Sequence, residues 1–277
     1  DVDLPTVPPV PLDKSLSLLG SEDNSQLREW LHAPQLISGV ETVRRKKFVW
    51  ASSHEWATVI SRGAKVGMFG YVELHHVARD EKGKPFLAGA FCVPKGSRRL
   101  RFIIDVDCNG FLAAPQYAVE NMALPYASLL TLLSIDESQY IAFSGDDDAN
   151  AFYAHAWSDL WLPYFCLAKP VPRSVFPSSP DDQLDPDRLV YPAVRCLPMG
   201  WEFSVAVLQQ VQLTLAEVAQ LPKSREIRSD AILPDMRTGL PAWAYYVDNF
   251  DEIRICSAHD PHTAHEPTAF QLNTRAV

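Results

Sequence analysis

The spacing of apolar residues along the chain predicts several helices. The clearest is expected over Trp201–Leu221, where apolar side chains recur every three or four residues on one helical face: Val205, Leu208, Val211, Leu215 and Val218. Shorter helices are predicted at Asn24–Leu31 and Ser53–Ser61, and the apolar residues of Pro125–Ile135 also recur at helical spacing.

Apolar runs between turn-forming residues predict strands. In the first half of the chain these runs are Tyr71–His75, Phe86–Val93 and Leu100–Asp105, which together indicate one antiparallel unit. The turn formers Lys82-Gly83-Lys84 and Pro94-Lys95-Gly96 separate them.

In the second half, Tyr140–Gly145 is predicted as a short buried strand that runs into the acidic sequence Asp146-Asp147-Asp148. Leu160–Leu167 is a further strand candidate. Trp243–Val247 and Ile253–Cys256 flank a polar tip, which predicts a hairpin. Two polar, Pro-containing stretches are expected to be long loops: Arg173–Leu189 and Pro222–Leu240.

These elements predict an α+β fold in four consecutive regions. Residues 1–40 begin with four prolines and no periodic pattern, so they are expected to be extended and partly disordered. Residues 41–135 form a β-rich region, and residues 136–256 an antiparallel sheet backed by helices. Residues 257–277 are a tail without a core pattern.

The charge of the chain is unevenly distributed. The whole chain of 277 residues, 47% of them hydrophobic, carries a net charge of −9, which by itself argues against nucleic-acid binding. Residues 41–101, however, hold 13 Lys and Arg against 5 Asp and Glu, so this stretch carries +8 and the remainder −17. A basic region on an acidic protein is typical of a nucleic-acid or nucleotide-phosphate binder. An ordinary uneven surface is the alternative.

Cysteine usage and hydropathy indicate an intracellular protein, in cytoplasm or nucleus. The five cysteines are scattered, without a C-x-x-C pair, which favours buried free thiols over disulfides or a structural zinc site. No apolar run approaches the roughly 20 residues that span a bilayer, so no membrane partner is expected. The first residue is Asp and no signal peptide follows, which predicts a segment of a longer protein.

Three segments could carry chemistry. In Phe143–Tyr153 a strand delivers carboxylates at its end and then turns into a helix, although a solvated acidic helix cap is the alternative. In Leu197–Gln209 a Pro-x-Gly turn enters the long helix, where the alternative is a plain loop–helix junction. In Tyr245–Phe250 a tight hairpin holds Asp248 at its tip, where an ordinary polar turn is the alternative.

Taken in this order, the three segments resemble the palm motifs of the reverse transcriptase family of retroviruses and retrotransposons. Residues Asp147 to Phe152 are similar to the family's Asp-x-x-x-x-aromatic motif. Leu197 to Gln209 is similar to Leu-Pro-x-Gly-x-x-x-Ser with a Gln five residues beyond the Ser, and is the most specific of the three. Tyr246-Val247-Asp248-Asn249 is similar to Tyr-x-Asp-Asp.

The resemblance extends upstream and covers roughly residues 85–256. Lys95 and Arg101–Asp105, with Asn109 close behind, resemble the fingers motif that grips an incoming triphosphate. The resemblance therefore implies a right-hand polymerase, with residues 41–135 as fingers, an antiparallel palm sheet backed by helices, and no thumb in this chain.

The function implied is RNA-directed DNA polymerisation for a mobile element, with nucleotides transferred from dNTPs to a primer 3′-hydroxyl on an RNA or DNA template. Catalytic roles would fall to Asp147, Asp248 and Asn249. Mg²⁺ or Mn²⁺ would be held by Asp147, Asp248 and the backbone carbonyl of Asp148. The nucleotide-binding set would be Lys95, Arg101, Phe152, Met199, Gly200, Ser204 and Gln209.

Within this set, Phe152 is expected to clash with a ribose 2′-hydroxyl and so to favour deoxynucleotides. Further polyprotein domains are also implied, namely a thumb and an RNase H. One departure supports an alternative function. Asn249 stands where the family usually has a second Asp, so the chain could be a catalytically degenerate reverse-transcriptase-like domain that only binds nucleic acid.

Three other features are weaker. His259, His262 and His265 recur every three residues and could bind a metal, although Pro261 and Pro267 interrupt any helix there. The basic run Arg44–Lys47 could contact a phosphate backbone or could be a solvated run. His75-His76, inside the predicted β unit, is expected to be structural.

Overall fold

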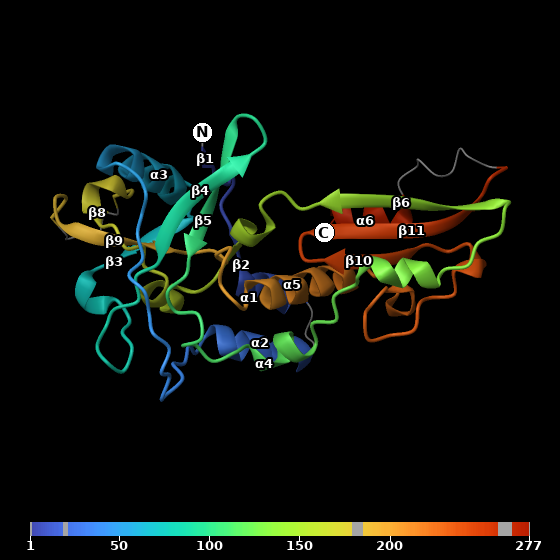
Figure 1. Ribbon diagram of the computed structural model, residues 1–277, viewed down its shortest axis with the longest axis horizontal. Coiled ribbons are helices and arrows are strands. Elements are labelled where there is room, and N and C mark those ends of the chain that lie inside the picture. Colours follow the sequence, from blue (N-terminus) through green and yellow to red (C-terminus); the bar gives the residue numbers. More distant parts are fainter. Residues whose placement is uncertain (1, 19–21, 179–184, 260–267, 277) are drawn as a thin grey trace. The chain divides into compact units, whose positions relative to one another are not determined.

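The computed structural model describes residues 2–18, 22–178, 185–259 and 268–276. The chain is mixed α/β and divides into two compact units, each assembled from separate stretches of sequence (Figure 1). Unit 1 comprises 1–14, 25–115 and 150–204, and unit 2 comprises 15–24, 116–149 and 205–277. Each unit is described by itself below.

The first sheet of unit 1 has the strand order β1-β5-β4. Strands β4 (Gly89–Lys95) and β5 (Arg99–Asp105) form an antiparallel hairpin, and β1 (Val2–Asp3) pairs with β5 in parallel. One face of the hairpin is buried through Ala90, Phe102 and Ile104, and the alternation of strand side chains turns the basic residues to the other face.

The second sheet of unit 1 has the strand order β3-β9-β8. Strand β9 (Leu189–Val194) lies between β3 (Phe69–Val72) and β8 (Val171–Pro172), antiparallel to both. A short parallel pair joins β2 (Val10–Pro11) to β7 (His155–Ala156).

Helix α3 (Ser53–Lys65) packs closely on β3. A capping box starts the helix: the Ser52 hydroxyl accepts from the Glu55 backbone N–H, and the Glu55 carboxylate accepts from the Ser52 N–H. A Cβ on Gly63 would lie 2.4 Å from the Phe69 ring, so only glycine permits this approach. Trp56 and Ile60 bury the same face of the helix.

The remaining elements of unit 1 surround an aromatic cluster. Trp157, Trp161 and Trp201 contact one another at ring-centroid distances of 5.4–5.7 Å, and Trp30 stacks on Trp201 at 5.7 Å. Aromatic pairs at such distances add to the stability that burial provides. Unit 1 also contains short 3-10 helices, of which η4 carries Trp161: η1 (Leu74–His76), η3 (Ala151–Ala154), η4 (Asp159–Tyr164) and η5 (Arg173–Val175).

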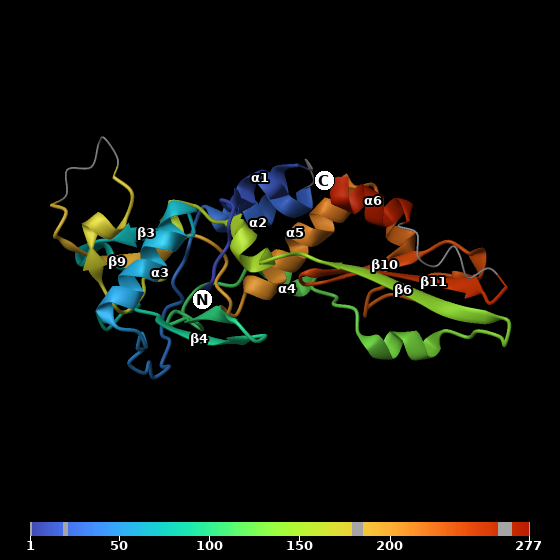
Figure 2. The same ribbon diagram turned by 90° about the horizontal axis from the view of Figure 1, so that it is seen from above.

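Unit 2 is built on one antiparallel sheet of order β10-β11-β6. Its strands are β6 (Gln139–Asp147), β10 (Ala242–Tyr246) and β11 (Asn249–Ser257). Figure 2 shows α5 (Ser204–Val218) and α6 (Ala269–Ala276) on one face of this sheet and the green turn η2 (Ala127–Leu132) on the other. The smaller elements are α4 (Gln116–Glu120), η6 (Lys223–Arg225) and η7 (Met236–Thr238).

Each face of this sheet has its own core. On the helix-covered face, Ala216 and Ala219 pack against Trp243, Tyr245 and Phe250. On the opposite face the core lies toward one end of the strands and consists of Leu129, Ile227, Met236, Ala242, Ala244 and Ile253. The helices α1 (Leu12–Ser17) and α2 (Glu22–Leu31) each contribute residues to both units.

Three predicted helices are confirmed, although their ends are shifted: Asn24–Leu31, Ser53–Ser61 and Trp201–Leu221. The C-terminal hairpin is confirmed as well. The strand prediction at Leu160–Leu167 is wrong: Asp159–Tyr164 is a 3-10 helix around Pro163. Pro125–Ile135 contains only a 3-10 helix. Residues 12–17 are not extended as predicted, because they form α1, which buries Leu12 and Leu16.

The strand predictions need three further corrections. Strand β3 ends at Val72, and the next residues form η1 rather than continuing to His75. Strand β6 is longer than predicted and is not buried, because alternate residues along it are exposed. Strand β9 is absent from the sequence prediction, because Pro192 at its centre interrupts a strand pattern.

All five cysteines are free thiols, and three of them, Cys108, Cys166 and Cys196, are buried as predicted, whereas Cys92 is exposed and Cys256 is half-buried. No described helix has the length and apolar character that crossing a membrane requires.

Loss of the capping box at α3 should destabilise the protein measurably. In Ser52→Ala the N–H of Glu55 loses its acceptor, so the free energy of unfolding should fall by about 1 kcal/mol. Urea denaturation measures this change. Ser53→Ala is the matched control, and an equal loss in both variants would show that the cap contributes nothing specific.

Candidate metal and nucleotide site

The acidic run of unit 2 lies at the end of strand β6, and its pairing with β11 decides which way each side chain points. Asp146 is opposite Phe250 and Asp147 is opposite Asn249. Because successive strand residues point to opposite faces, Asp146 and Asp147 lie on different faces of the sheet.

Asp146 lies on the helix-covered face and is already paired. The Arg275 guanidinium of α6 donates to both of its carboxylate oxygens, at 2.7 and 3.0 Å. The neighbouring Ser144 hydroxyl accepts from Gln271 of the same helix at 3.0 Å. Asp147 therefore lies on the opposite face, which we call the open face and define by Phe143, Gly145, Asp147, Tyr246, Asn249 and Asp251.

The β10–β11 hairpin turns through two residues, Val247 and Asp248, because Tyr246 pairs with Asn249. Val247 has φ = 61°, a conformation that costs a β-branched residue roughly 1–3 kcal/mol. Buried Gln209 of α5 stabilises this turn with both ends of its amide. Its Nε2 donates to the Tyr245 carbonyl at 3.0 Å, and its Oε1 accepts from the Val247 N–H at 2.9 Å.

Asp148 joins the acidic strand to the hairpin tip. Its backbone N–H donates to the Asp248 carbonyl at 2.8 Å, and its carboxylate accepts from the buried Gln212 amide. Desolvation raises the pKa of Asp148, and the nearby negative charges of Asp147, Asp248 and Asp146 raise it further, while the Gln212 hydrogen bond opposes them. Negative charge is therefore concentrated at this edge of the sheet.

The donor chemistry here fits a hard divalent cation. Asp147, Asp148 and Asp248 offer only oxygen atoms, which Mg²⁺ and Mn²⁺ prefer. Desolvation is the largest cause of the raised pKa of Asp148, and the neighbouring carboxylates add to it. These three carboxylates do not form one group of ligand atoms within 4.8 Å of one another, so binding an ion would require their side chains to rotate inward.

A shallow apolar pocket of about 400 Å³ adjoins the acidic residues on the open face. Phe143 and Tyr246 line it and remain 60% and 48% exposed, which is unusual for aromatic side chains. Asp251 also lines it, and a Cβ on Gly145 would lie 2.7 Å from the Asp251 carboxylate. Desolvation raises the pKa of Asp251.

The basic candidates lie in unit 1, on the β4–β5 hairpin. Lys95 pairs with Arg99 and Val93 with Arg101 across the ladder, so Lys95 and Arg101 are on the same face. The Lys95 ammonium donates to the Asp3 carboxylate of β1 at 2.8 Å. This hydrogen bond is the main reason why the pKa of Asp3 is lowered.

Phe152 lies in η3, which follows Asn150 in the left-handed conformation at φ = 58°. Its neighbour Tyr153 is buried and its hydroxyl donates to the Phe102 carbonyl at 2.7 Å, which fixes η3 against β5. Phe152 itself stays half-buried.

In the Leu197–Gln209 segment, Gly200 lets the backbone lie close against that of Ile104. Gly200 has φ = 109°, and a Cβ there would lie 2.5 Å from the Ile104 carbonyl oxygen. The Asn109 amide donates to the Gly200 carbonyl at 2.9 Å. Ser204 is buried and its hydroxyl donates to the Pro198 carbonyl at 2.8 Å, while Met199 is half-buried.

The predicted site residues thus form two groups. Unit 2 brings together Asp147, Asp148, Asp248, Asn249 and Gln209, and unit 1 contains Lys95, Arg101, Phe152, Met199, Gly200 and Ser204. Sequence reasoning missed Gln212 and Asp251. Gln212 had a signal, because it lies three residues after Gln209 on the helix and both are polar in an apolar stripe.

The structure bears on two weaker candidates, the basic run that begins at Arg44 and the histidine series that begins at His259. Arg44 is neither a free phosphate contact nor solvated, because its buried guanidinium pairs with Asp80 and Asp107 and lies 4.2 Å from the Phe86 ring centroid. The histidine series places only His259 among the described residues; His262 and His265 lie outside them.

Comparison with protein-family models found no matching family, and comparison with curated proteins found no match either.

Loss of the Gln209 amide should destabilise the hairpin. In Gln209→Ala the buried Val247 N–H and Tyr245 carbonyl lose their partners, so the free energy of unfolding should fall by about 1–3 kcal/mol. Gln210→Ala, which removes one half-buried bond to Asn24, should cost about 1 kcal/mol or less. Chemical denaturation of both variants measures the difference. Equal losses of stability would show that the two Gln209 hydrogen bonds do not specifically stabilise the hairpin turn.

Because the pKa of Asp148 is raised, removing its negative charge should stabilise the fold by an amount that depends on pH. A carboxyl whose pKa is higher in the folded state binds more protons there, so its ionisation destabilises the fold as pH rises above 3.8. Asp148→Asn should therefore be more stable than the parent at pH 7, and the gain should shrink toward pH 4. Thermal unfolding across this range tests it. Asp146→Asn, which loses an ion pair, should show no such gain.

Proposed function

We propose that this chain is the fingers and palm part of a reverse transcriptase, an RNA-directed DNA polymerase of a mobile element. One observation supports this most directly. The pairing of β6 with β11 directs Asp147 to the open face and joins Asp148 to Asp248 at the hairpin tip, with two helices covering the other face. A palm needs its carboxylates on a part of the sheet that nucleic acid can reach.

Each residue has a role in this proposal. Asp147, Asp248 and the Asp148 carbonyl would hold Mg²⁺ or Mn²⁺, which when bound supplies charge neutralisation for transfer of a nucleotide to a primer 3′-hydroxyl. Gln209 holds the hairpin backbone in its strained form, so that Asp248 keeps its position. Lys95 and Arg101 are assigned to the triphosphate of the dNTP, whose negative charge they would offset.

Sugar selection is assigned to Phe152. Its half-buried ring is carried by a backbone that the Tyr153 hydroxyl anchors to β5, so the ring has limited freedom to yield. A bulky side chain at this place would exclude a ribose 2′-hydroxyl. The exposed rings of Phe143 and Tyr246, on the same face of the sheet as Asp147, offer apolar surface to bases of the primer–template.

A second candidate function is nucleic-acid binding without catalysis. The observation that favours it is the Asn249 amide, which donates to the Asp248 carboxylate at 3.2 Å. With a neutral amide at position 249, the hairpin offers a cation one carboxylate fewer. The same amide also occupies one oxygen of the Asp248 carboxylate. Both candidates predict primer–template binding that weakens steeply with salt.

Primer extension on the intact protein with Mg²⁺ and dNTPs tests the proposal. Asp147→Asn and Asp248→Asn should each lower incorporation by at least about 100-fold. Asp146→Asn is the matched control, because its carboxylate faces α6 and should change incorporation by only a factor of a few. Incorporation that survives Asp147→Asn, or falls equally in Asp146→Asn, would overturn the site.

The same assay separates the two candidates. If the protein is a polymerase, Asn249→Asp should raise its incorporation, since it restores a carboxylate beside Asp248. If it only binds nucleic acid, the parent shows no incorporation above background and Asn249→Asp finds none to raise.

A further inference from the structure

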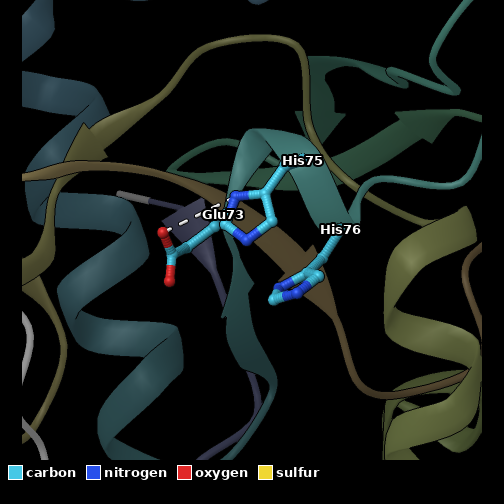
Figure 3. A group of neighbouring side chains, drawn as sticks. All are labelled: Glu73, His75 and His76. Atoms are coloured by element: carbon cyan, nitrogen blue, oxygen red, sulfur yellow. Dashed lines mark ion pairs between the residues drawn. The ribbon is translucent and has the colours of Figure 1, made fainter.

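A group of potential metal ligands lies in unit 1, apart in sequence from the acidic residues of the proposed palm. Glu73, His75 and His76 each offer one ligand atom, and these atoms all lie within 4.8 Å of one another (Figure 3). Within residues 2–18, 22–178, 185–259 and 268–276, no other trio of His, Cys, Asp or Glu meets that distance. Three candidate ligands for a nitrogen-preferring metal therefore lie in one short turn.

The backbone that carries these ligands is fixed on both sides. Glu73 follows the last residue of β3, which is paired with β9, and the His76 N–H donates to the Glu73 carbonyl at 2.9 Å. Just beyond the turn, the Ala78 N–H donates to the Pro163 carbonyl at 3.0 Å. Metal binding would therefore need to order side chains only, which reduces its entropic cost.

The side chains are also uncommitted to the local helix. Glu73 is the N-cap residue of η1, but its carboxylate makes no capping hydrogen bond there. The His75 and His76 rings are exposed, with centroids 3.9 Å apart, and His75 Nδ1 lies 3.8 Å from the Glu73 carboxylate. Tetrahedral zinc needs ligand atoms roughly 3.4 Å apart, so shifts of about 1 Å in the three ligand atoms would bring them to this spacing.

Two imidazoles and one carboxylate select the type of ion. Zinc sites with two His and one Glu leave a fourth position for water, whereas Mg²⁺ prefers oxygen ligands and retains its own waters. We propose that Glu73, His75 and His76 form a surface site for a divalent transition-metal ion of the zinc type. This site does not depend on the proposed polymerase function.

Arg188 regulates this site electrostatically. Its guanidinium, which precedes β9, forms a close ion pair with the Glu73 carboxylate. The arginine and the metal ion therefore compete for one carboxylate, and Arg188 must turn away when the ion binds. Removing that positive charge should strengthen metal binding, whereas a purely structural ion pair would give no such gain.

Isothermal titration of ZnCl₂ into the full chain, with any affinity tag removed, tests this proposal. We expect one zinc ion per chain, at least tenfold weaker binding in His75→Ala, His76→Ala and Glu73→Gln, and at least threefold tighter binding in Arg188→Gln. His54→Ala, which removes another exposed histidine of unit 1, should bind zinc as the parent does. Mg²⁺ at millimolar concentration should not displace the zinc.

Circular dichroism of each variant confirms that it is folded before titration. The absence of zinc binding by the parent would overturn the site, as would unchanged binding in His75→Ala and His76→Ala together. Weaker or unchanged binding in Arg188→Gln would overturn the role of Arg188. Zinc titration is carried out without primer–template or dNTPs, whereas incorporation tests the palm, so failure of the palm assignment and failure of this site are distinguishable.

Discussion

The register between β6 and β11 is the constraint on which the candidate site depends. A strand has a period of two, so a slip of β6 by one residue would move each of its side chains to the other face of the sheet. Asp147 would then point into the helices and Asp146 would lose Arg275. The ion pair to α6 and the apolar contacts of Trp243 and Phe250 on the same face oppose that slip. Packing on the covered face thereby fixes which acid is presented on the other.

The proposed metal site contains two locally unfavourable features, a strained backbone residue and a partly desolvated carboxyl among other negative charges. Val247 is held in the left-handed region, and the pKa of Asp148 is raised by its surroundings. Neither feature stabilises the fold, and both are tolerated because Gln209 and Gln212 bond them from a well-packed helix. Such local conflict at an otherwise consistent sheet is typical of a site kept for function rather than stability.

The sequence predicts those parts of the fold whose signals are local. The α5 periodicity and the C-terminal hairpin were readable because apolar spacing and turn residues agree over short windows. Strand β9 was not readable, because Pro192 argues against a strand and only its neighbours β3 and β8 make one there. The order of Asp147 and Asp248 suggested the site, but the clamp by Gln209, the position of Asp251 and the division of the motifs between two units depend on tertiary pairing. Arg44 shows the same limit, since nothing local predicts that a residue in a basic run is buried between two aspartates.

The pairing of Lys95 with Asp3 gives the basic hairpin a built-in competitor. Asp3 belongs to the same chain and is held next to β5 by β1, so its effective concentration at Lys95 is far higher than that of any dissolved anion. A phosphate that takes the Lys95 ammonium away from Asp3 leaves this carboxylate without its partner. If the hairpin holds a triphosphate as proposed, a ligand with several charges offsets that loss better than an anion with a single charge.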